Sequence, residues 1–120
     1  MRKKQPLELT IGVDLGDKSS RYCVLDREGT VLLERSIATS KKGLAQAFAS
    51  MGASRIAIEV GTHSPWISRL LERLGHQVIV ANARQVKLIS QSSKKNDRLD
   101  AEFLARLARA DLRCRADKAP

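Results

Sequence analysis

The stretch Leu7-Glu8-Leu9-Thr10-Ile11-Gly12-Val13-Asp14 alternates apolar and polar residues and ends in an aspartate. A period of two residues is typical of a β-strand with one buried face. Two further strands are predicted at residues 21–26 and 31–37, and Arg27-Glu28-Gly29-Thr30 between them has the composition of a hairpin turn. The chain is therefore predicted to begin with three antiparallel strands.

The pattern then changes to alternating helices and strands. Helix signals run from a cap at Thr39 or Ser40 to Gly52, and from the cap pair Ser64-Pro65 to Gly75. The other predicted elements are strands at 55–60 and 77–81, a short helix at 82–89, a polar loop at 90–95 and a last helix at 96–109. The order β-β-β-α-β-α-β-α-α predicts a single α/β domain over residues 1–120, with a mixed five-stranded sheet and flanking helices.

Two acids end strands that this topology brings together. A crossover connection can return the strand at 55–60 parallel to the first strand and beside it. Asp14 ends the first strand and Glu59 ends the later one. We therefore expect their carboxylates to be neighbours at the carboxyl edge of the sheet.

The last predicted helix carries two more acids. At ~100° per residue its apolar residues spread over one arc, with Asp100 inside that arc and Asp97 at its margin. The apolar arc consists of Phe103, Leu104, Leu107 and Ala108, and the opposite face of Arg98, Glu102, Arg106 and Arg109. A carboxylate that points into a core needs a proton or a positive partner. Two of them three residues apart suggest a metal ion.

Asp14, Glu59, Asp97 and Asp100 together predict a site for Mg²⁺, with Mn²⁺ as a substitute, because hard divalent cations bind oxygen ligands. Two such ions can activate a nucleophile and stabilise a leaving oxygen in phosphoryl transfer. Three of the acids also have a structural explanation: a turn cap for Asp14, a solvated loop position for Glu59 and a helix cap for Asp97. Such an explanation is weakest for Asp100, because it is expected to point into the core. His63 follows Glu59 closely and is a weaker candidate for the same site.

The net charge favours a polyanionic partner. Lys and Arg outnumber Asp and Glu by 22 to 13, which gives a formal charge of +9. Nucleic acid is the first candidate, although a solvated basic surface explains the charge about equally well. The residues expected to contact nucleic acid are Lys18, Arg84, Lys87, Lys94, Lys95, Arg98, Arg106 and Arg109.

Other features narrow the class of protein. Four aromatic residues of the Phe, Tyr and Trp types are too few for a base-stacking platform, so contacts to phosphates are expected instead. Cys23 and Cys114 make neither a disulfide framework nor a zinc pattern, which fits a reducing cytoplasm. The sequence contains no apolar run long enough for a membrane span and no secretory signal.

Three motifs together resemble a known family. They are Ile11-Gly12-Val13-Asp14-Leu15-Gly16-Asp17-Lys18, Ile58-Glu59-Val60-Gly61 and Lys95-Asn96-Asp97-Arg98-Leu99-Asp100-Ala101. The chain resembles the N-terminal domain of the DEDD transposases of insertion sequences, which is RuvC-like with a ribonuclease H fold. The resemblance spans residues 9–111 and places the family's acidic tetrad on Asp14, Glu59, Asp97 and Asp100.

The resemblance implies a Mg²⁺-dependent enzyme that cleaves and transfers DNA strands in a prokaryotic cytoplasm. It also implies a structured guide RNA that bridges donor and target DNA. A homo-oligomer is expected for the full-length protein. Members of the family carry a C-terminal domain with a nucleophilic serine, and this sequence ends before such a domain. We therefore expect an incomplete enzyme.

Three other functions stay open from the sequence. A stand-alone Holliday-junction resolvase shares the early Asp-x-Gly-x-Lys pattern and a late acidic helix. An ATP-binding domain of the actin and sugar-kinase type also begins with Gly-x-Asp-x-Gly, but it needs a second Gly-rich phosphate loop, which this sequence lacks. A non-catalytic nucleic-acid-binding module would bind in a salt-sensitive manner, indifferent to metal and to Asp100→Asn.

Overall fold

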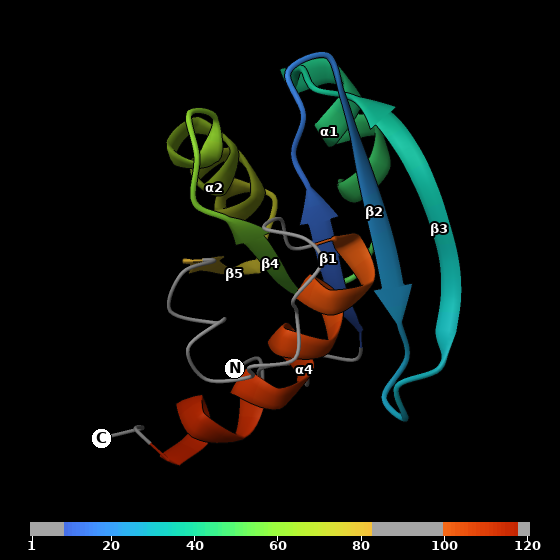
Figure 1. The fold of residues 1–120 in the computed structure, drawn as a ribbon, viewed down its shortest axis with the longest axis vertical. Helices are drawn as coiled ribbons and strands as arrows, with labels where there is room; N and C mark the ends of the chain where they lie inside the picture. The colour runs from blue at the N-terminus through green and yellow to red at the C-terminus, as the bar shows by residue number, and fades with distance from the viewer. Residues whose placement is uncertain (1–8, 83–99, 118–120) are drawn as a thin grey trace, which may run out of the picture.

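The computed structural model describes residues 9–82 and 100–117, with side chains up to residue 110 (Figure 1). In chain order the elements are β1 Thr10–Asp14, β2 Ser19–Leu25, β3 Val31–Ala38, α1 Lys41–Phe48, β4 Arg55–Glu59, α2 Ser64–Arg73, β5 Gln77–Ala81 and α4 Ala101–Asp117. Apart from Asn82, the predicted helix at 82–89 and loop at 90–95 lie outside the described residues. None of the described helices is long and apolar enough to cross a membrane.

The strands form one mixed five-stranded sheet in the order β3-β2-β1-β4-β5. β1 pairs antiparallel with β2, and β2 pairs antiparallel with β3. On the other side β1 pairs parallel with β4, and β4 pairs parallel with β5. The predicted antiparallel start, the parallel return beside β1 and the ribonuclease H-like α/β class are all confirmed.

The turn between β2 and β3 is closed by one aspartate. Asp26 Oδ1 accepts hydrogen bonds from the backbone N–H groups of Glu28 and Thr30, each at 2.9 Å. Gly29 adopts φ 87°, a conformation that side-chain-bearing residues rarely reach. The predicted hairpin turn therefore follows from an Asx-type turn and a positive-φ glycine.

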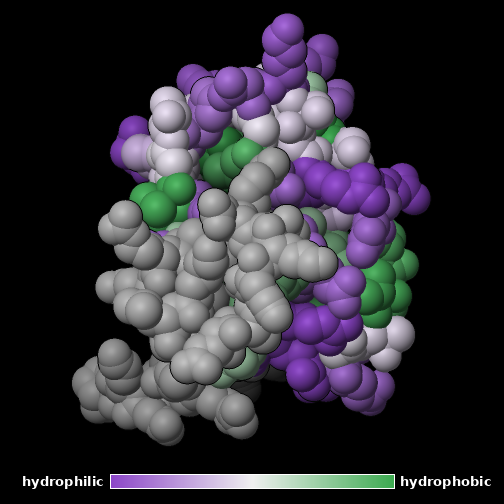
Figure 2. All heavy atoms as spheres, viewed as in Figure 1, coloured by the Kyte–Doolittle hydropathy of each residue, from purple (hydrophilic) through white to green (hydrophobic). Residues whose placement is uncertain are grey.

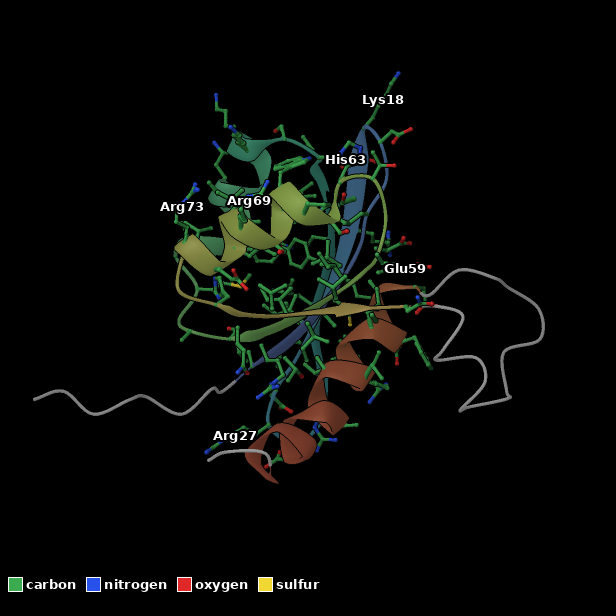
Figure 3. All side chains as sticks on the ribbon, turned by 90° about the vertical axis from the view of Figure 1, so that its left-hand side faces the viewer. Lys18, Arg27, Glu59, His63, Arg69 and Arg73 are labelled. Carbon is green, nitrogen blue, oxygen red and sulfur yellow. The ribbon has the colours of Figure 1, made fainter. Side chains whose placement is uncertain are left out.

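Helices cover both faces of the sheet, with α2 and α4 on opposite sides (Figure 3). One face packs against α1 and α2, and its buried core includes Val13, Ile58, Leu44, Phe48 and Ile67. The other face packs against α4 through smaller side chains. On the face seen in Figure 2, hydrophilic residues gather at the top of the molecule.

Buried His76 ties the first helix layer to the sheet. Its Nδ1 accepts a hydrogen bond from the N–H of Ser54 at 3.2 Å, and its Nε2 donates to the carbonyl of Phe48 at 2.9 Å. Both ring nitrogens are thereby satisfied, as burial requires. His76, for which the sequence gives no role, is a structural residue.

Gly12 sets how closely α4 approaches the sheet. A Cβ atom built at Gly12 would overlap backbone atoms of Ala101 and Ala105 and would lie 2.7 Å from the Cβ atom of Leu104. Only a residue without a side chain fits under the helix here. The first turn of α4 therefore lies directly on β1, close to its carboxyl end.

Candidate active site

Asp14 and Glu59 stand at the ends of neighbouring parallel strands. Asp14 is the last residue of β1 and Glu59 is the last residue of β4. The register pairs Val13 with Ile58 immediately before them. Both acids are half-buried. The expected adjacency of these two strand ends is confirmed.

The alternation of side chains along a strand decides which face the two acids share. Val13 and Ile58 point into the core under α1 and α2, whereas Gly12 and Ala57 lie under α4. The two acids are two residues beyond Gly12 and Ala57, so they lie on the α4 face. This is the face on which the third described acid of the predicted tetrad is also found.

That third acid, Asp100, is placed differently from the prediction. The sequence predicts a helix that already contains Asp100 on its inward face, but α4 begins at Ala101 and Asp100 is exposed. Its Oδ1 accepts a hydrogen bond from the N–H of Phe103 at 2.8 Å, and its carbonyl accepts one from Leu104 at 3.0 Å. Asp100 is therefore the N-cap of α4, and burial gives it no need of a cation.

The inward face of α4 is also narrower and smaller than predicted. Up to residue 110, its buried residues are Ala101, Leu104, Ala105 and Ala108. Phe103 and Leu107, which the periodicity assigns to the core, are only partly buried at its margin. Small residues occupy the centre because the helix lies so close to β1. The predicted polar face is confirmed for Glu102, Arg106 and Arg109, which are exposed.

Asp97 lies outside the described residues, so its place beside the other three acids stays a prediction. Among the residues that the structure describes, no three His, Cys, Asp or Glu side chains lie close enough to hold a metal ion together. Asp14, Glu59 and Asp100 share one face of the sheet near its carboxyl edge without forming a three-ligand cluster.

A pocket opens beside Glu59. Its volume is about 370 Å³, and the loops that follow β1 and β4 line it. The lining residues are Leu15, Gly16, Asp17, Glu59, Val60, Gly61, Thr62 and His63. Crevices beyond the carboxyl ends of the strands are the usual ligand sites of open α/β sheets.

Two of the lining residues, Asp17 and His63, belong to a hydrogen-bonded chain of three side chains. The indole N–H of Trp66 donates to His63 Nδ1 at 3.1 Å, so a neutral His63 carries its proton on Nε2. His63 Nε2 lies 3.3 Å from Asp17 Oδ1. The chain joins the start of α2 to the loop after β1, and it involves a histidine that the sequence leaves as a weak candidate.

The sequence could indicate part of this arrangement. His63 and Trp66 are three residues apart at a predicted helix start, a spacing that allows contact. However, Ser64, the predicted cap of this helix, is its first residue, and the N-cap is His63, which makes no capping bond with its side chain. The Ser64 hydroxyl instead donates to the carbonyl of Gly61 at 2.9 Å. The partner Asp17 could not be found without the fold.

The predicted nucleic-acid contacts fall into three groups. Lys18 is exposed at the tip of the loop between β1 and β2. Arg106 pairs with Glu102 at 2.9 Å and donates to the carbonyl of Gly29 at 3.3 Å, while Arg109 donates twice to the carbonyl of Arg27. These two arginines thus hold the β2–β3 turn, and their contact with phosphate stays a prediction. The remaining five, Arg84, Lys87, Lys94, Lys95 and Arg98, lie outside the described residues.

Cys23 has no place in this chemistry. It is fully buried on β2 beside Ala101 and Ala105 of α4. Burial, followed by the negative charges of Glu34 and Glu102, raises the pKa of its thiol to about 11. The side chain is therefore protonated and unreactive at neutral pH.

A mixed sheet with two acids at its carboxyl edge and an acid-capped helix on the same face defines a ribonuclease H-like domain with an acidic site. The model of the IS110-type DEDD transposase family, described as "Transposase", matches residues 11–119. The chain belongs to this family.

A curated relative agrees with this assignment. "Putative transposase y4uE" of Sinorhizobium fredii (strain NBRC 101917 / NGR234) is 31% identical over 116 residues, which cover 86% of this chain and 32% of the relative. The chain thus spans about a third of the length of that relative.

Two solved structures match part of this chain. The ethanolamine utilization protein EutJ from Carboxydothermus hydrogenoformans matches with a TM-score of 0.45 and 15% identity, over 74% of this chain and 42% of that protein. The inorganic polyphosphate/ATP-glucomannokinase from Arthrobacter sp. strain KM matches with a TM-score of 0.42 and 20% identity, over 63% and 44%. Likeness of this size carries no conclusion about function.

Proposed function

We propose that this chain is the catalytic domain of an insertion-sequence transposase that cleaves and transfers DNA strands with a divalent metal ion. The observation that carries the proposal is the placement of Asp14 and Glu59 at neighbouring strand ends, on the face covered by α4. Membership in the DEDD transposase family supports the assignment of these two acids, with Asp97 and Asp100, to one catalytic tetrad.

The described acids fit a divalent cation of the Mg²⁺ type. Asp14 and Glu59 are half-buried carboxylates, and carboxylate oxygens are the ligands that Mg²⁺ and Mn²⁺ prefer. Asp100 uses Oδ1 for its cap, and the second oxygen of a carboxylate can accept another partner. Asp97 would complete the set, an assignment that rests on the Asn-Asp-x-x-Asp motif.

When bound, the metal would supply electrostatic stabilisation of a phosphodiester under attack and acidify a water molecule. The chain itself positions the substrate. Gly16 and Gly61 in the pocket carry no side chain, so a phosphate can approach the backbone there. The His63–Asp17 contact holds the two pocket loops together, which limits the freedom of a strand bound beside Glu59.

The partners we propose are donor DNA, target DNA and a structured guide RNA, all of them polyanions. The formal charge of +9 supports polyanion binding, because phosphate neutralisation by Lys and Arg supplies most nonspecific affinity. The guide RNA and a homo-oligomeric assembly rest on the family resemblance.

Thermal unfolding with and without Mg²⁺ or Mn²⁺ tests the metal site. A cation at ~100 times its dissociation constant stabilises a fold by about 2.7 kcal/mol. For a domain of this size the midpoint should rise by about 10 °C. We expect this rise in the wild type and in Glu72→Gln, an exposed control on α2, and its loss in Asp14→Asn and Glu59→Gln. An equal rise in all four proteins would exclude these acids as ligands.

Strand transfer is tested in a transposase of the relative's length that contains this sequence. Asp14→Ala, Asp97→Ala and Asp100→Ala are each expected to abolish recombination of a marked element while protein levels stay normal. Recombination that survives all three substitutions would refute the tetrad. Cleavage of a four-way DNA junction by the 120-residue chain alone would instead favour the resolvase function.

A further inference from the structure

Five exposed cations form a second charged surface, away from the arginines of α4. They are Lys18 in the loop after β1, Lys41 and Lys42 in α1, and Arg69 and Arg73 in α2. We call this set the α1–α2 basic surface. Within the described residues none of the five side chains has a hydrogen bond or an ion pair. By contrast Arg21, Arg106 and Arg109 are engaged with protein groups.

The five residues lie on one side of the molecule. The carbonyl of Lys18 accepts a hydrogen bond from Thr39 N–H at 2.9 Å, and the hydroxyls of Ser20 and Thr39 lie 2.6 Å apart. These bonds tie the Lys18 loop to the start of α1, where Lys41 and Lys42 follow. Figure 3 shows Arg69 and Arg73 along α2, on its side away from the sheet, with Lys18 beyond the end of α2 that carries His63.

Several of these charges are unfavourable for the domain alone, although Arg73 in the last turn of α2 is favoured by the helix dipole. Lys41 and Lys42 occupy the first turn of α1, where the helix dipole disfavours cations. Arg69 and Arg73 are four residues apart on one helix, a spacing at which like charges repel. Glu72 is the single carboxylate of α1 and α2. A bound polyanion would turn each of these repulsions into attraction.

The surface is continuous with the candidate active site. Lys18 follows Asp17, which lines the pocket, and His63 of the same pocket directly precedes α2. Arg69 and Arg73 are separated by about 6 Å along the helix axis. Duplex DNA carries one negative charge per about 1.7 Å of its axis, so phosphates are available to both arginines.

The aromatic content argues against a single strand at this surface. Trp66 is the aromatic residue of α2, and it is partly buried with its indole N–H bound to His63. Base stacking would need an exposed ring. We propose that the α1–α2 basic surface binds the duplex DNA that flanks the strand held at the carboxylates, an inference that rests on the proposed function.

The test measures binding of a fluorescein-labelled 30-base-pair duplex to this chain by anisotropy, in EDTA, across a series of salt concentrations. The variant is Arg69→Gln with Arg73→Gln. The matched control is Arg27→Gln with Arg35→Gln, which removes the same charge from exposed residues on the β2–β3 side. Glutamine is a good helix former, and equal unfolding midpoints establish that both variants fold.

Each phosphate contact contributes about 0.9 to the slope of log affinity against log salt. We expect the Arg69/Arg73 variant to lose about 1.8 from that slope, and the Arg27/Arg35 control to keep it. An equal decrease of the slope in both variants, or no decrease in the Arg69/Arg73 variant, would refute DNA binding by the α1–α2 basic surface. Loss confined to a 30-base-pair RNA duplex, with DNA binding unchanged, would also overturn it.

The proposed function is tested separately, by the metal-dependent thermal unfolding of wild type and Asp14→Asn. If metal stabilisation disappears in Asp14→Asn while the Arg69/Arg73 variant binds DNA normally, the surface is rejected and the metal site is kept. If the slope changes as expected but metals stabilise neither wild type nor Asp14→Asn, the surface is supported as a DNA-binding face and the catalytic assignment loses its support.

Discussion

Gly12→Ala is expected to displace α4 and with it the acid at its start. The new methyl group would overlap backbone atoms of Ala101 and Ala105, and backbone cannot move aside as the end of a flexible side chain can. Overpacking of a core costs about 1–3 kcal/mol, and backbone obstruction places this change at the upper end, about 3 kcal/mol. The unfolding midpoint should fall by about 10 °C.

The matched control is Gly52→Ala. Gly52 is exposed, and a Cβ atom built there meets nothing within 4 Å. This change should be neutral or stabilise the fold by about 0.4–1 kcal/mol, because alanine restricts the unfolded chain.

The assay is thermal unfolding of both variants beside the wild type, followed by titration with Mn²⁺. We expect Gly12→Ala to lose both stability and metal response, and Gly52→Ala to keep both. If Gly12→Ala unfolds at the same temperature as Gly52→Ala, the close contact between α4 and β1 is refuted.

Three further outcomes are expected. Asp100→Asn retains the N-cap acceptor for the N–H of Phe103 and should leave the free energy of unfolding nearly unchanged, whereas Asp100→Ala should lower it by about 1 kcal/mol. Equal losses of stability for the two variants in urea unfolding would contradict the capping role. Folding raises the pKa of Cys23 from 9.0 to about 11. The stability difference between wild type and Cys23→Ala should therefore be constant below pH 9 and should shrink as the pH rises toward 11. A difference that does not depend on pH in urea titrations would refute this expectation. His76→Leu should cost about 1–3 kcal/mol, because it leaves the buried N–H of Ser54 without its acceptor. A loss well below about 1 kcal/mol would show that another group replaces the ring.

The alternating strand pattern is sufficient to predict the sheet and the placement of two acids at neighbouring strand ends. Alternation locates β1, and the rule for crossover connections places β4 beside it, so the adjacency of Asp14 and Glu59 follows from local pattern and topology. No side-chain detail is needed for that step. This is why the part of the candidate site that rests on strand ends could be predicted.

The start of the last helix could not be predicted in the same way. Asp97 and Asp100 are both suitable N-cap residues, each followed by residues that continue the helical period. Periodicity alone therefore extends the helix backwards past its true start and turns a cap into an inward-facing residue. The choice of Asp100 depends on the docking of α4 against Gly12, which is a tertiary contact.

The partners of the late arginines were beyond sequence reasoning for a related reason. Arg106 and Arg109 donate to carbonyl groups of Gly29 and Arg27, which are about 80 residues away in the chain. Charge and helical spacing show that these side chains face outward, but not that a turn lies within their reach. The sequence therefore predicts either a nucleic-acid contact or a solvated basic face, and neither prediction includes contact with the β2–β3 turn.

The attachment of α4 at its first turn and at its middle bears on how the proposed DNA substrate would approach the acids. The first turn of α4 packs on β1 at Gly12. Arg106 and Arg109, at the middle of α4, donate hydrogen bonds to the turn after β2. A rod of 17 residues, about 25 Å long, thus covers this face from β2 to β4. Among the described residues, α4 therefore lies over β2, β1 and β4, and the pocket beside Glu59 lies beyond the ends of β1 and β4. Under the proposed function, the helix would direct a DNA strand toward this pocket as well as hold Asp100.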